Sequence, residues 1–207
     1  MIPLQEAKSI VTNHIFSMET ESVSLSETGN RILAQDIVAT FPSPQFDNSA
    51  MDGFAVLSSD TKDATPENPV ILKLVGVSSA GTPSDIQLKE GECIQCMTGA
   101  KIPNGADAII MVEDSSGFSD AESVQIRIEA SPGKHIRKMG EEIKEGEILI
   151  EKGVRISPNE IGTMATFGYG KIEVARKPKI AIFGTGDELI EPGNKLKEGQ
   201  IYNSNLY

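Results

Sequence analysis

The sequence predicts an α+β protein with more than one domain. Short strand-like segments separated by turn residues fill residues 54 to about 130 without helical patterns between them, which is typical of a small β-barrel or sandwich. Two prolines, Pro42 and Pro44, end the regular pattern just before this segment. The apolar run IAIF, at 180–183, is typical of a strand buried on both faces of a parallel α/β sheet.

The N-terminal part predicts one helix and two strands. Apolar residues recur near helical spacing in residues 3–16, which predicts an amphipathic opening helix that packs through one face. Strands are expected next at residues 21–25 and 31–39. The strands expected in the β-rich segment are FAVL, PVILKLVGV, GECIQCM, DAIIMVE and SVQIRIE.

A second helix should begin at Ser157. This residue is a good N-cap, Pro158 suits the first turn, and Glu160 completes a capping box. The helix should end near Gly168, and KIEVARKP should then form a strand. Because the 24 residues after Phe183 lack the helix and second strand of a parallel unit, we expect the chain to be the front part of a longer protein.

The composition narrows the function classes. With 39% hydrophobic and 24% charged residues, the chain is expected to be ordered and globular. Nineteen basic and thirty acidic residues give a net charge of -11, which argues against nucleic acid as the main partner, because phosphate contacts need an extended basic face. A hydrophobic leader and an apolar run of roughly 20 residues are both missing, so a cytoplasmic location without membrane contact is expected.

Cys93 and Cys96 form a single CxxC pair. Zinc would need two more ligands, and the two histidines, His14 and His135, do not lie at a recognisable metal spacing. On a strand the two thiols would point to opposite faces. We expect ordinary buried thiols, with metal or redox chemistry as the alternative.

Four polar clusters could carry chemistry: FDNSAMDG, MTGAKIPNGADA, GKHIRKMGEEI and GTGDEL. Each alone could be a plain loop, because glycine and Asx residues form turns. The third cluster gathers Lys134, His135, Arg137 and Lys138 within five residues of an acidic chain, which favours a bound phosphate or other oxyanion. The alternative is a solvated basic turn balanced by neighbouring glutamates.

Oxygen-bearing side chains complement that basic loop. Asp52, Glu142 and Glu188, with the hydroxyl of Thr98, are the groups that metal-assisted phosphoryl chemistry needs, because Mg2+ prefers carboxylate, water and phosphate oxygens. In the first cluster we expect Asp47 and Asn48 to hold the loop's shape through Asx hydrogen bonds. Met51 and Phe54 are expected to anchor the loop on the β-rich segment. Asp52 therefore remains the functional candidate of the first cluster.

These clusters, in this order, resemble the molybdopterin molybdenumtransferase family, which includes MoeA and the E domain of gephyrin. The resemblance covers essentially the whole chain, and the block DNSAMDG is highly specific. It implies insertion of molybdate into adenylylated molybdopterin, with release of AMP and assistance by a divalent cation such as Mg2+. It also implies a homodimer that works with a molybdopterin adenylyltransferase.

The family architecture implies a split N-terminal domain, residues 1–43 plus 135–176, that mediates dimerisation. An inserted β-rich, barrel-like domain would span 44–134, and 177–207 would start an α/β, molybdopterin-binding domain. The family site lies between the inserted domain of one subunit and the α/β domain of the other. Because later family motifs are missing, we expect the chain alone to be inactive or impaired.

The site residues follow from the matching motifs. The family's catalytic positions fall on Asp52, Thr98, Glu142 and Glu188, although this chain has GEE where the family usually has GED. Asp52 and Glu188 would position metal, water or molybdate, while the ligands of the metal itself remain unassigned. The substrate-binding positions would be Ser49, Gly99, Arg137, Lys138 and Asp187.

Two other functions stay open. The gephyrin branch also acts as a non-catalytic scaffold that clusters receptors, which binding to receptor-loop peptides would reveal. The chain could instead be a small-anion or sugar-phosphate binding module built on a β-barrel. A ligand screen by thermal shift would detect the second, because a ligand that binds only the folded state raises stability.

Overall fold

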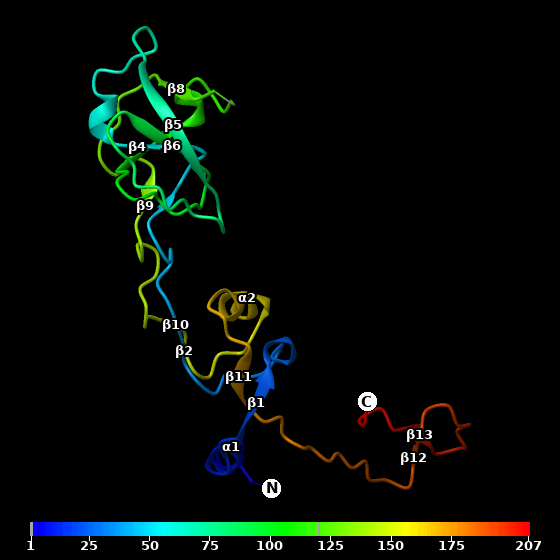
Figure 1. Ribbon diagram of the computed structural model, residues 1–207. Helices are drawn as coiled ribbons and strands as arrows, with labels where there is room; N and C mark the ends of the chain where they lie inside the picture. Colours follow the sequence, from blue (N-terminus) through cyan, green and yellow to red (C-terminus); the bar gives the residue numbers. More distant parts are fainter. Residues whose placement is uncertain (1, 120) are drawn as a thin grey trace.

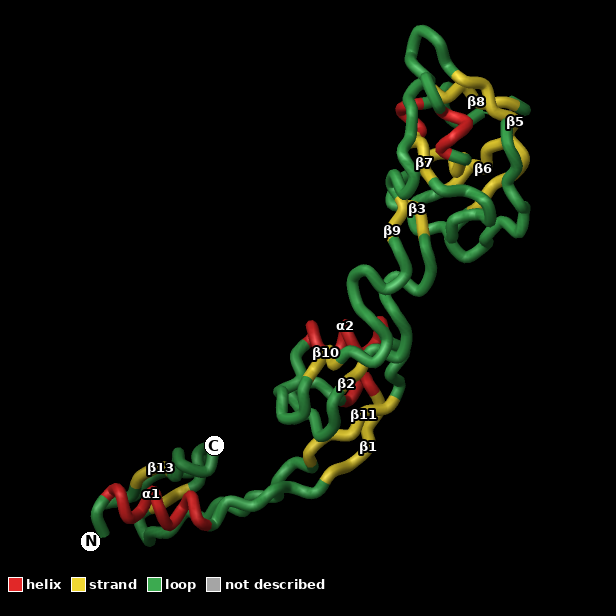
Figure 2. Tube along the Cα trace, turned by 90° about the vertical axis from the view of Figure 1, so that its left-hand side faces the viewer, coloured by secondary structure: helices red, strands yellow, loops and turns green. Residues whose placement is uncertain are grey.

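The structure is a computed structural model that describes residues 2–119 and 121–207 (Figure 1). The chain is mostly β with few helices and has an elongated shape, with a β-rich unit at one end and the C-terminal segment near the other (Figures 1 and 2). The two α-helices are α1 (Leu4–Asn13) and α2 (Pro158–Thr166). No helix in the described residues has both the length and the apolar character needed to cross a membrane.

A middle unit is built from segments far apart in the sequence. Strand β1 (Thr20–Ser24) pairs antiparallel with β11 (Lys171–Ala175), and β2 (Ile37–Val38) pairs antiparallel with β10 (Ile148–Ile150). Helix α2 packs on these strands and contributes Met164 to the buried cluster. The other buried members of this cluster are Leu33, Ile37, Ile150, Ile156, Ile172 and Val174.

Helix α2 begins as its sequence predicts. The Ser157 hydroxyl accepts a hydrogen bond from the Asn159 backbone N–H at 3.2 Å, and the Glu160 carboxylate accepts the Ser157 N–H at 2.8 Å. This capping box satisfies amide groups that would otherwise lack partners in the first turn. Gly168, at φ +78°, follows the helix in the left-handed conformation that glycine adopts without strain.

The β-rich unit contains a five-stranded sheet in the order β7-β4-β6-β5-β8. Neighbours are antiparallel except β5 and β6, which are parallel. The sheet curls into a half-barrel, and two buried clusters include Phe54 and Ile110 in one, and Ile94 and Ile109 in the other. The strands are β4 (Gly53–Val56), β5 (Val70–Ser78), β6 (Glu92–Cys96), β7 (Ala108–Met111) and β8 (Ser123–Ile126).

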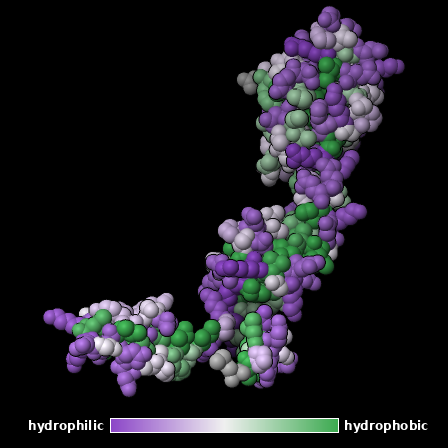
Figure 3. Space-filling view, turned by 180° about the vertical axis from the view of Figure 1, so that it is seen from behind, coloured by the Kyte–Doolittle hydropathy of each residue, from purple (hydrophilic) through white to green (hydrophobic). Residues whose placement is uncertain are grey.

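The two units are joined by two stretches of chain that run side by side (Figure 2). Strands β3 (Asn48–Ser49) and β9 (Ile136–Arg137) pair antiparallel where these stretches enter the β-rich unit. Hydrophobic surface gathers over the middle unit and towards the junction, whereas the β-rich unit is largely hydrophilic (Figure 3). The exposed apolar side chains of the middle unit include Ile32, Val38 and Ile148.

Three sequence-based expectations about local structure were wrong. Helix α1 forms, but none of its residues is buried, so it does not pack through its apolar face within the described residues. Residues 180–183 form no strand, and Ile180 and Phe183 are 76% and 84% exposed, because no strand of the described residues pairs with them. In the predicted strand at 31–39 only β2 is regular, with isolated bridges at Ile32 and Leu33.

The C-terminal segment instead contains a two-stranded parallel pair. Strand β12 (Leu189–Ile190) pairs with β13 (Ile201–Tyr202), and the backbone N–H of Ile201 donates to the Glu188 carbonyl at 2.8 Å. The Asn203 side chain packs against Gly184, where an added Cβ would collide with its amide. This small arrangement holds the two ends of the acidic GTGDEL loop close to the last residues of the chain.

Candidate functional site

Asp52 is the predicted functional residue of the first polar cluster. This residue directly precedes β4, and its Oδ1 accepts two hydrogen bonds from Thr98, one from the backbone N–H at 2.7 Å and one from the hydroxyl at 2.8 Å. These bonds hold the pKa of Asp52 below its usual value, the backbone bond contributing most. Asp52 is therefore a solvent-exposed, ionised carboxylate whose Oδ2 makes no hydrogen bond within the described residues.

Ser49 and Gly99 shape the two loops that carry this pair. Ser49 is fully buried, and its hydroxyl donates to the Met51 carbonyl at 2.5 Å. The Gly99 N–H donates to the Ser49 carbonyl at 2.8 Å, and Gly99 has φ +79°. The structure thus brings Ser49, Asp52, Thr98 and Gly99 together, with Ser49 turned inward in this conformation.

Asp47 orders the basic loop. Its Oδ2 accepts from the Lys138 ammonium at 2.8 Å and its Oδ1 accepts the Met139 backbone N–H at 2.8 Å. Both contacts lower the pKa of the Asp47 carboxyl, with the Lys138 hydrogen bond contributing most. The Asx hydrogen bonds expected of Asp47 and Asn48 are therefore absent from the described residues: Asp47 bonds the loop around Lys138 and not its own turn, and the Asn48 side chain makes no hydrogen bond.

The remaining residues of the basic loop differ in their surroundings. Arg137, on β9, is exposed and joins no ion pair among the described residues. Lys138 shares its charge with Asp47. The Glu142 carboxylate accepts a hydrogen bond from the Ser43 hydroxyl at 3.2 Å, in the two-stretch junction between the units.

The prediction that Met51 and Phe54 anchor the first cluster is confirmed for Phe54 and wrong for Met51. Phe54 is 1% exposed and belongs to a core cluster of the β-rich unit, so it fixes the loop as predicted. Met51 is 38% exposed and belongs to no core cluster of the described residues, so it does not anchor the loop as predicted.

Asp187 and Glu188 lie far from the other predicted site residues. Both are exposed in the loop before β12, which lies well away from β4 and β9 in Figure 1, and its partner strand β13 lies well away from β3 and β9 in Figure 2. A single copy of the chain in this conformation therefore presents Asp52 and Glu188 in separate places. The predicted site residues divide into one group on the β-rich unit and its junction and a second group at the C-terminal end.

The two cysteines are buried, as expected. Cys93 and Cys96 lie on β6 but belong to different core clusters, in agreement with the expected opposite orientation. Burial raises the pKa of Cys93 to about 12 and that of Cys96 to about 11. Thiols held in this protonated state are poor metal ligands and poor nucleophiles.

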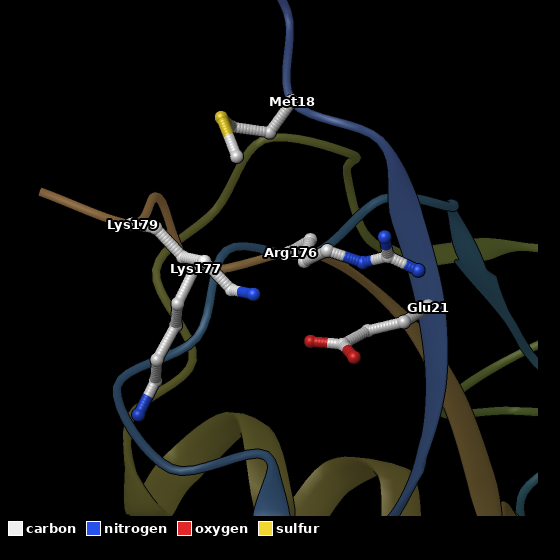
Figure 4. Close-up of a pocket in the computed structure, with 5 residues that line it drawn as sticks. All are labelled: Met18, Glu21, Arg176, Lys177 and Lys179. Carbon is white, nitrogen blue, oxygen red and sulfur yellow. The ribbon is translucent and has the colours of Figure 1, made fainter.

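A pocket of about 620 Å³ lies elsewhere, beside β1 and the end of β11 (Figure 4). Its lining is partly basic, but Arg176 is bonded to Glu19 at 2.8 Å and Glu21 is bonded to Arg31. None of the predicted site residues borders it. The residues that line it are Met18, Glu21, Arg176, Lys177 and Lys179.

Family models, curated relatives and solved structures agree on what this chain is similar to. Residues 2–168 match the family described as the MoeA N-terminal region, domains I and II. Curated relatives called molybdopterin molybdenumtransferase, from Staphylococcus aureus (strain Mu50) and Bacillus subtilis (strain 168), are 40% and 39% identical to this chain. Each comparison covers 99% of this chain and 48% of the relative, so the chain spans about half the length of these curated relatives.

Solved structures give the same result. A crystal structure of a molybdopterin biosynthesis MoeA protein from Pyrococcus horikoshii OT3 is 35% identical, with a TM-score of 0.88. The match covers 99% of this chain and 54% of the chain in that crystal structure. A second crystal structure of a MoeA protein from the same species has a TM-score of 0.85 at 36% identity and covers 99% of this chain and 52% of its own.

Proposed function

We propose that this chain acts in molybdenum cofactor biosynthesis as part of a molybdopterin molybdenumtransferase. The chain belongs to the MoeA family, because its residues 2–168 match the N-terminal region of that family. The reaction would insert molybdate into adenylylated molybdopterin and release AMP. The adenylylated substrate would come from a molybdopterin adenylyltransferase, which we propose as the partner. Neither nucleic acid nor a membrane is part of this function, and a cytoplasmic setting suits it.

The pairing of Asp52 with Thr98 is the observation that carries the proposal for this half of the site. Two hydrogen bonds fix one carboxylate oxygen and keep the group ionised, while Oδ2 remains free to accept a proton or a hydrogen bond. A positioned carboxylate of this kind can orient water or hold a cation beside an anionic substrate. We assign Asp52 the catalytic role and Thr98 the role of holding it.

The described residues offer Mg2+ only a small share of its ligands. No group of three or more His, Cys, Asp or Glu residues capable of holding an ion occurs among them. One free oxygen on Asp52 fits an ion held mainly by water and substrate phosphates, as Mg2+ commonly is, and not an ion enclosed by the protein. Such an ion would supply charge stabilisation to the departing phosphate, and Asp52 would be its contact on this chain.

The basic loop would bind the anionic part of the substrate. Arg137 is exposed and has no carboxylate partner among the described residues, so its guanidinium is available to an oxyanion. Lys138 would also bind the anion, and its ammonium would then leave the ion pair with Asp47. Glu142, held near Ser43, would act at the margin of the site, and Ser49 and Gly99 would support the substrate through the loop they shape.

The separation between Asp52 and the acidic loop supports a homodimer. In one chain the loop before β12, which carries Asp187 and Glu188, lies well away from β4, which Asp52 directly precedes (Figure 1). A second copy could bring its acidic loop to the β-rich unit. We propose the domain division 1–43 plus 135–176, 44–134 and 177–207, supported by the separate cores of the middle and β-rich units.

The proposal can be tested with a hybrid enzyme. In the Staphylococcus aureus relative, the portion aligned with this chain would be replaced by these 207 residues, and molybdate-dependent AMP release would be measured. We expect an active hybrid, and loss of at least about a hundredfold in rate when Asp52 is replaced by alanine with dimerisation retained. The 207 residues alone should release no AMP. A folded, dimeric hybrid without activity, or an Asp52→Ala hybrid with the parent rate, would contradict the assignment.

A further inference from the structure

Three backbone segments run side by side at the end of the β-rich unit that faces the junction. Asn48 on β3 is directly opposite Arg137 on β9, and on its other side it is directly opposite Lys101. Residues that are directly opposite in antiparallel pairs project from the same face. Lys101, Asn48 and Arg137 therefore form a row on one face, which we call the oxyanion row.

The hydrogen bonds around Asn48 show how close the members of the row are. The Ser49 N–H donates to the Ala100 carbonyl at 3.0 Å, and the Ile102 N–H donates to the Asp47 carbonyl at 3.0 Å. These bonds flank the Asn48–Lys101 pair without joining it, which is the antiparallel arrangement with the closer side chains. The Lys101 side chain thus starts directly beside that of Asn48.

Asn48 is a buried amide whose side chain has no hydrogen-bond partner among the described residues. The residue is 8% exposed, its Oδ1 is buried without a hydrogen bond, and its side chain makes no hydrogen bond with the described residues. Its amide nitrogen is not among the fully buried unpaired atoms, so it remains accessible as a donor. Folded chains rarely leave a buried polar atom unpaired, and a ligand is one of the few explanations for such an atom.

The two flanking cations also have no carboxylate partner in the part of the chain that the structure describes. Lys101 and Arg137 are exposed, and neither joins an ion pair in residues 2–119 and 121–207. Lys138, by contrast, is directed to Asp47. Two unneutralised cations beside an accessible amide N–H, in a chain of net charge -11, form a local site for a compact anion.

We propose that the oxyanion row binds a tetrahedral oxyanion, either free or as a phosphate monoester. The Arg137 guanidinium contacts two oxygens, the Lys101 ammonium contacts a third, and the Asn48 amide N–H completes the set. A bound anion draws the guanidinium over the row, where its remaining N–H groups reach Asn48 Oδ1. The identity of the anion bound in the cell rests on the proposed function. Binding of an anion to the row does not, because it is a property of these 207 residues.

The test is an NMR titration of the 207-residue chain with sodium phosphate, sodium molybdate and AMP, each against sodium chloride at matched ionic strength. The signals followed are the Asn48 side-chain amide and the Arg137 Nε–H. Saturable shifts of both signals are expected with at least one probe. Shifts with phosphate or molybdate identify a free oxyanion as sufficient, and shifts with AMP alone identify a phosphate monoester. Failure of all three probes to shift either signal would overturn the proposal.

Variants separate the row from general charge attraction. Arg137→Gln and Lys101→Gln should each weaken binding by about tenfold or more, because each removes a charge-assisted hydrogen bond. Lys62→Gln removes an exposed lysine of the same unit that joins no ion pair among the described residues, and it should leave binding unchanged. Equal weakening by all three variants would mean that only net charge matters, and the row would be rejected.

Asn48→Leu provides an independent check. Leucine has a similar size and needs no hydrogen bonds, so a purely structural site would tolerate it and keep its affinity. We expect loss of binding in a folded protein. Unchanged affinity in folded Asn48→Leu would remove Asn48 from the site and overturn the proposal. If that variant does not fold, the exposed Lys101 and Arg137 variants decide the outcome.

Discussion

Asp52 and Thr98 are joined by two hydrogen bonds that end on the same carboxylate oxygen. The Thr98 N–H and hydroxyl reach Asp52 Oδ1 at 2.7 and 2.8 Å, while Oδ2 has no partner among the described residues. One oxygen thus fixes the orientation of the carboxylate and the other faces solvent. The Thr98 hydroxyl donates its hydrogen bond to Asp52 and so cannot donate one to a substrate at the same time. Two residues that look independent in the sequence act as one unit.

Thr98→Val should raise the pKa of Asp52 only part of the way to its ordinary value. Valine removes the hydroxyl donor, but the backbone N–H, which lowers the pKa most, remains. Because the folded-state pKa is depressed, the stabilisation from this contact is present above the unfolded pKa of about 3.9 and is lost as pH falls through the folded value. Carboxyl NMR titration measures the shift. Thr98→Ser keeps the hydroxyl donor and should leave the Asp52 pKa unchanged. If the Asp52 pKa in Thr98→Val equals that of the wild type, the Thr98 hydroxyl does not hold Asp52 in its ionised form.

Gly53 should not tolerate a side chain. It lies on the inner strand β4 between Cys96 of β6 and Met111 of β7, and an added Cβ would overlap the Ile110 carbonyl. We expect Gly53→Ala to lower the free energy of unfolding by about 3 kcal/mol or more, at the upper end for overpacked sites. Gly29→Ala, which meets nothing within 4 Å at ordinary φ, is the control and should be nearly neutral. Chemical denaturation of both variants gives the comparison.

Gly53 also shows what the motif around Asp52 contains. The sequence presents Asp52 and Gly53 as neighbours in one short block, but the structure gives them different roles. The glycine lets β7 approach β4, and the aspartate is thereby held at the start of that strand facing the Thr98 loop. A packing constraint and a chemical group are thus adjacent within one short block.

The two thiols should be unreactive in the folded chain. With pKa values of about 12 and about 11, Cys93 and Cys96 carry a thiolate fraction of about one in a thousand or less at pH 8. A colorimetric thiol reagent at pH 8 should therefore label the native chain only at the rate at which it opens. In guanidinium chloride both thiols should react at once. Rapid, stoichiometric labelling of the native chain would show that one thiol is accessible.

Two substitutions at α2 should change stability in opposite directions. Ser157→Ala removes the N-cap that bonds the Asn159 N–H and should cost about 1 kcal/mol. Gly162→Ala fills open space in the same helix and should stabilise by about 0.5 to 1 kcal/mol, because alanine loses less backbone entropy than glycine. Thermal or urea unfolding of the two variants measures both signs. A loss of stability in Gly162→Ala would indicate a contact at that face of α2.

Local signals predicted the elements that depend on nearby residues. The start of α2 follows from Ser157, Pro158 and Glu160, and the five strands of the half-barrel follow from alternation and turn residues. Pairings between distant segments were not predicted, such as β3 with β9 or the bond between Asp47 and Lys138. These depend on the path of the chain between the two units, and no local pattern encodes that path.

The candidate site was predictable to a similar extent. The motifs identify Asp52 and Thr98, but neither their mutual bonding nor the row formed by Lys101, Asn48 and Arg137 is visible in sequence spacing. Asn48 in particular looks like a turn residue until its burial and its unpaired oxygen are known. The expected strand at 180–183 failed for a related reason: its apolar residues call for neighbouring strands, and burial cannot occur without them.

If the site is shared between two copies, two inactive chains should rescue each other. The test uses hybrid enzymes in which these 207 residues replace the aligned half of the Staphylococcus aureus relative, one carrying Asp52→Ala and the other Glu188→Ala. Each homodimer should be inactive. In a mixed dimer, Asp52 from one chain and Glu188 from the other form one intact site, so unfolding, mixing and refolding equal amounts should restore about a quarter of the parent AMP-release rate. Sites built within a single chain would give no recovery, because every chain in the mixture lacks one of the two carboxylates. Mixing two Asp52→Ala samples is the matched control and should give no activity.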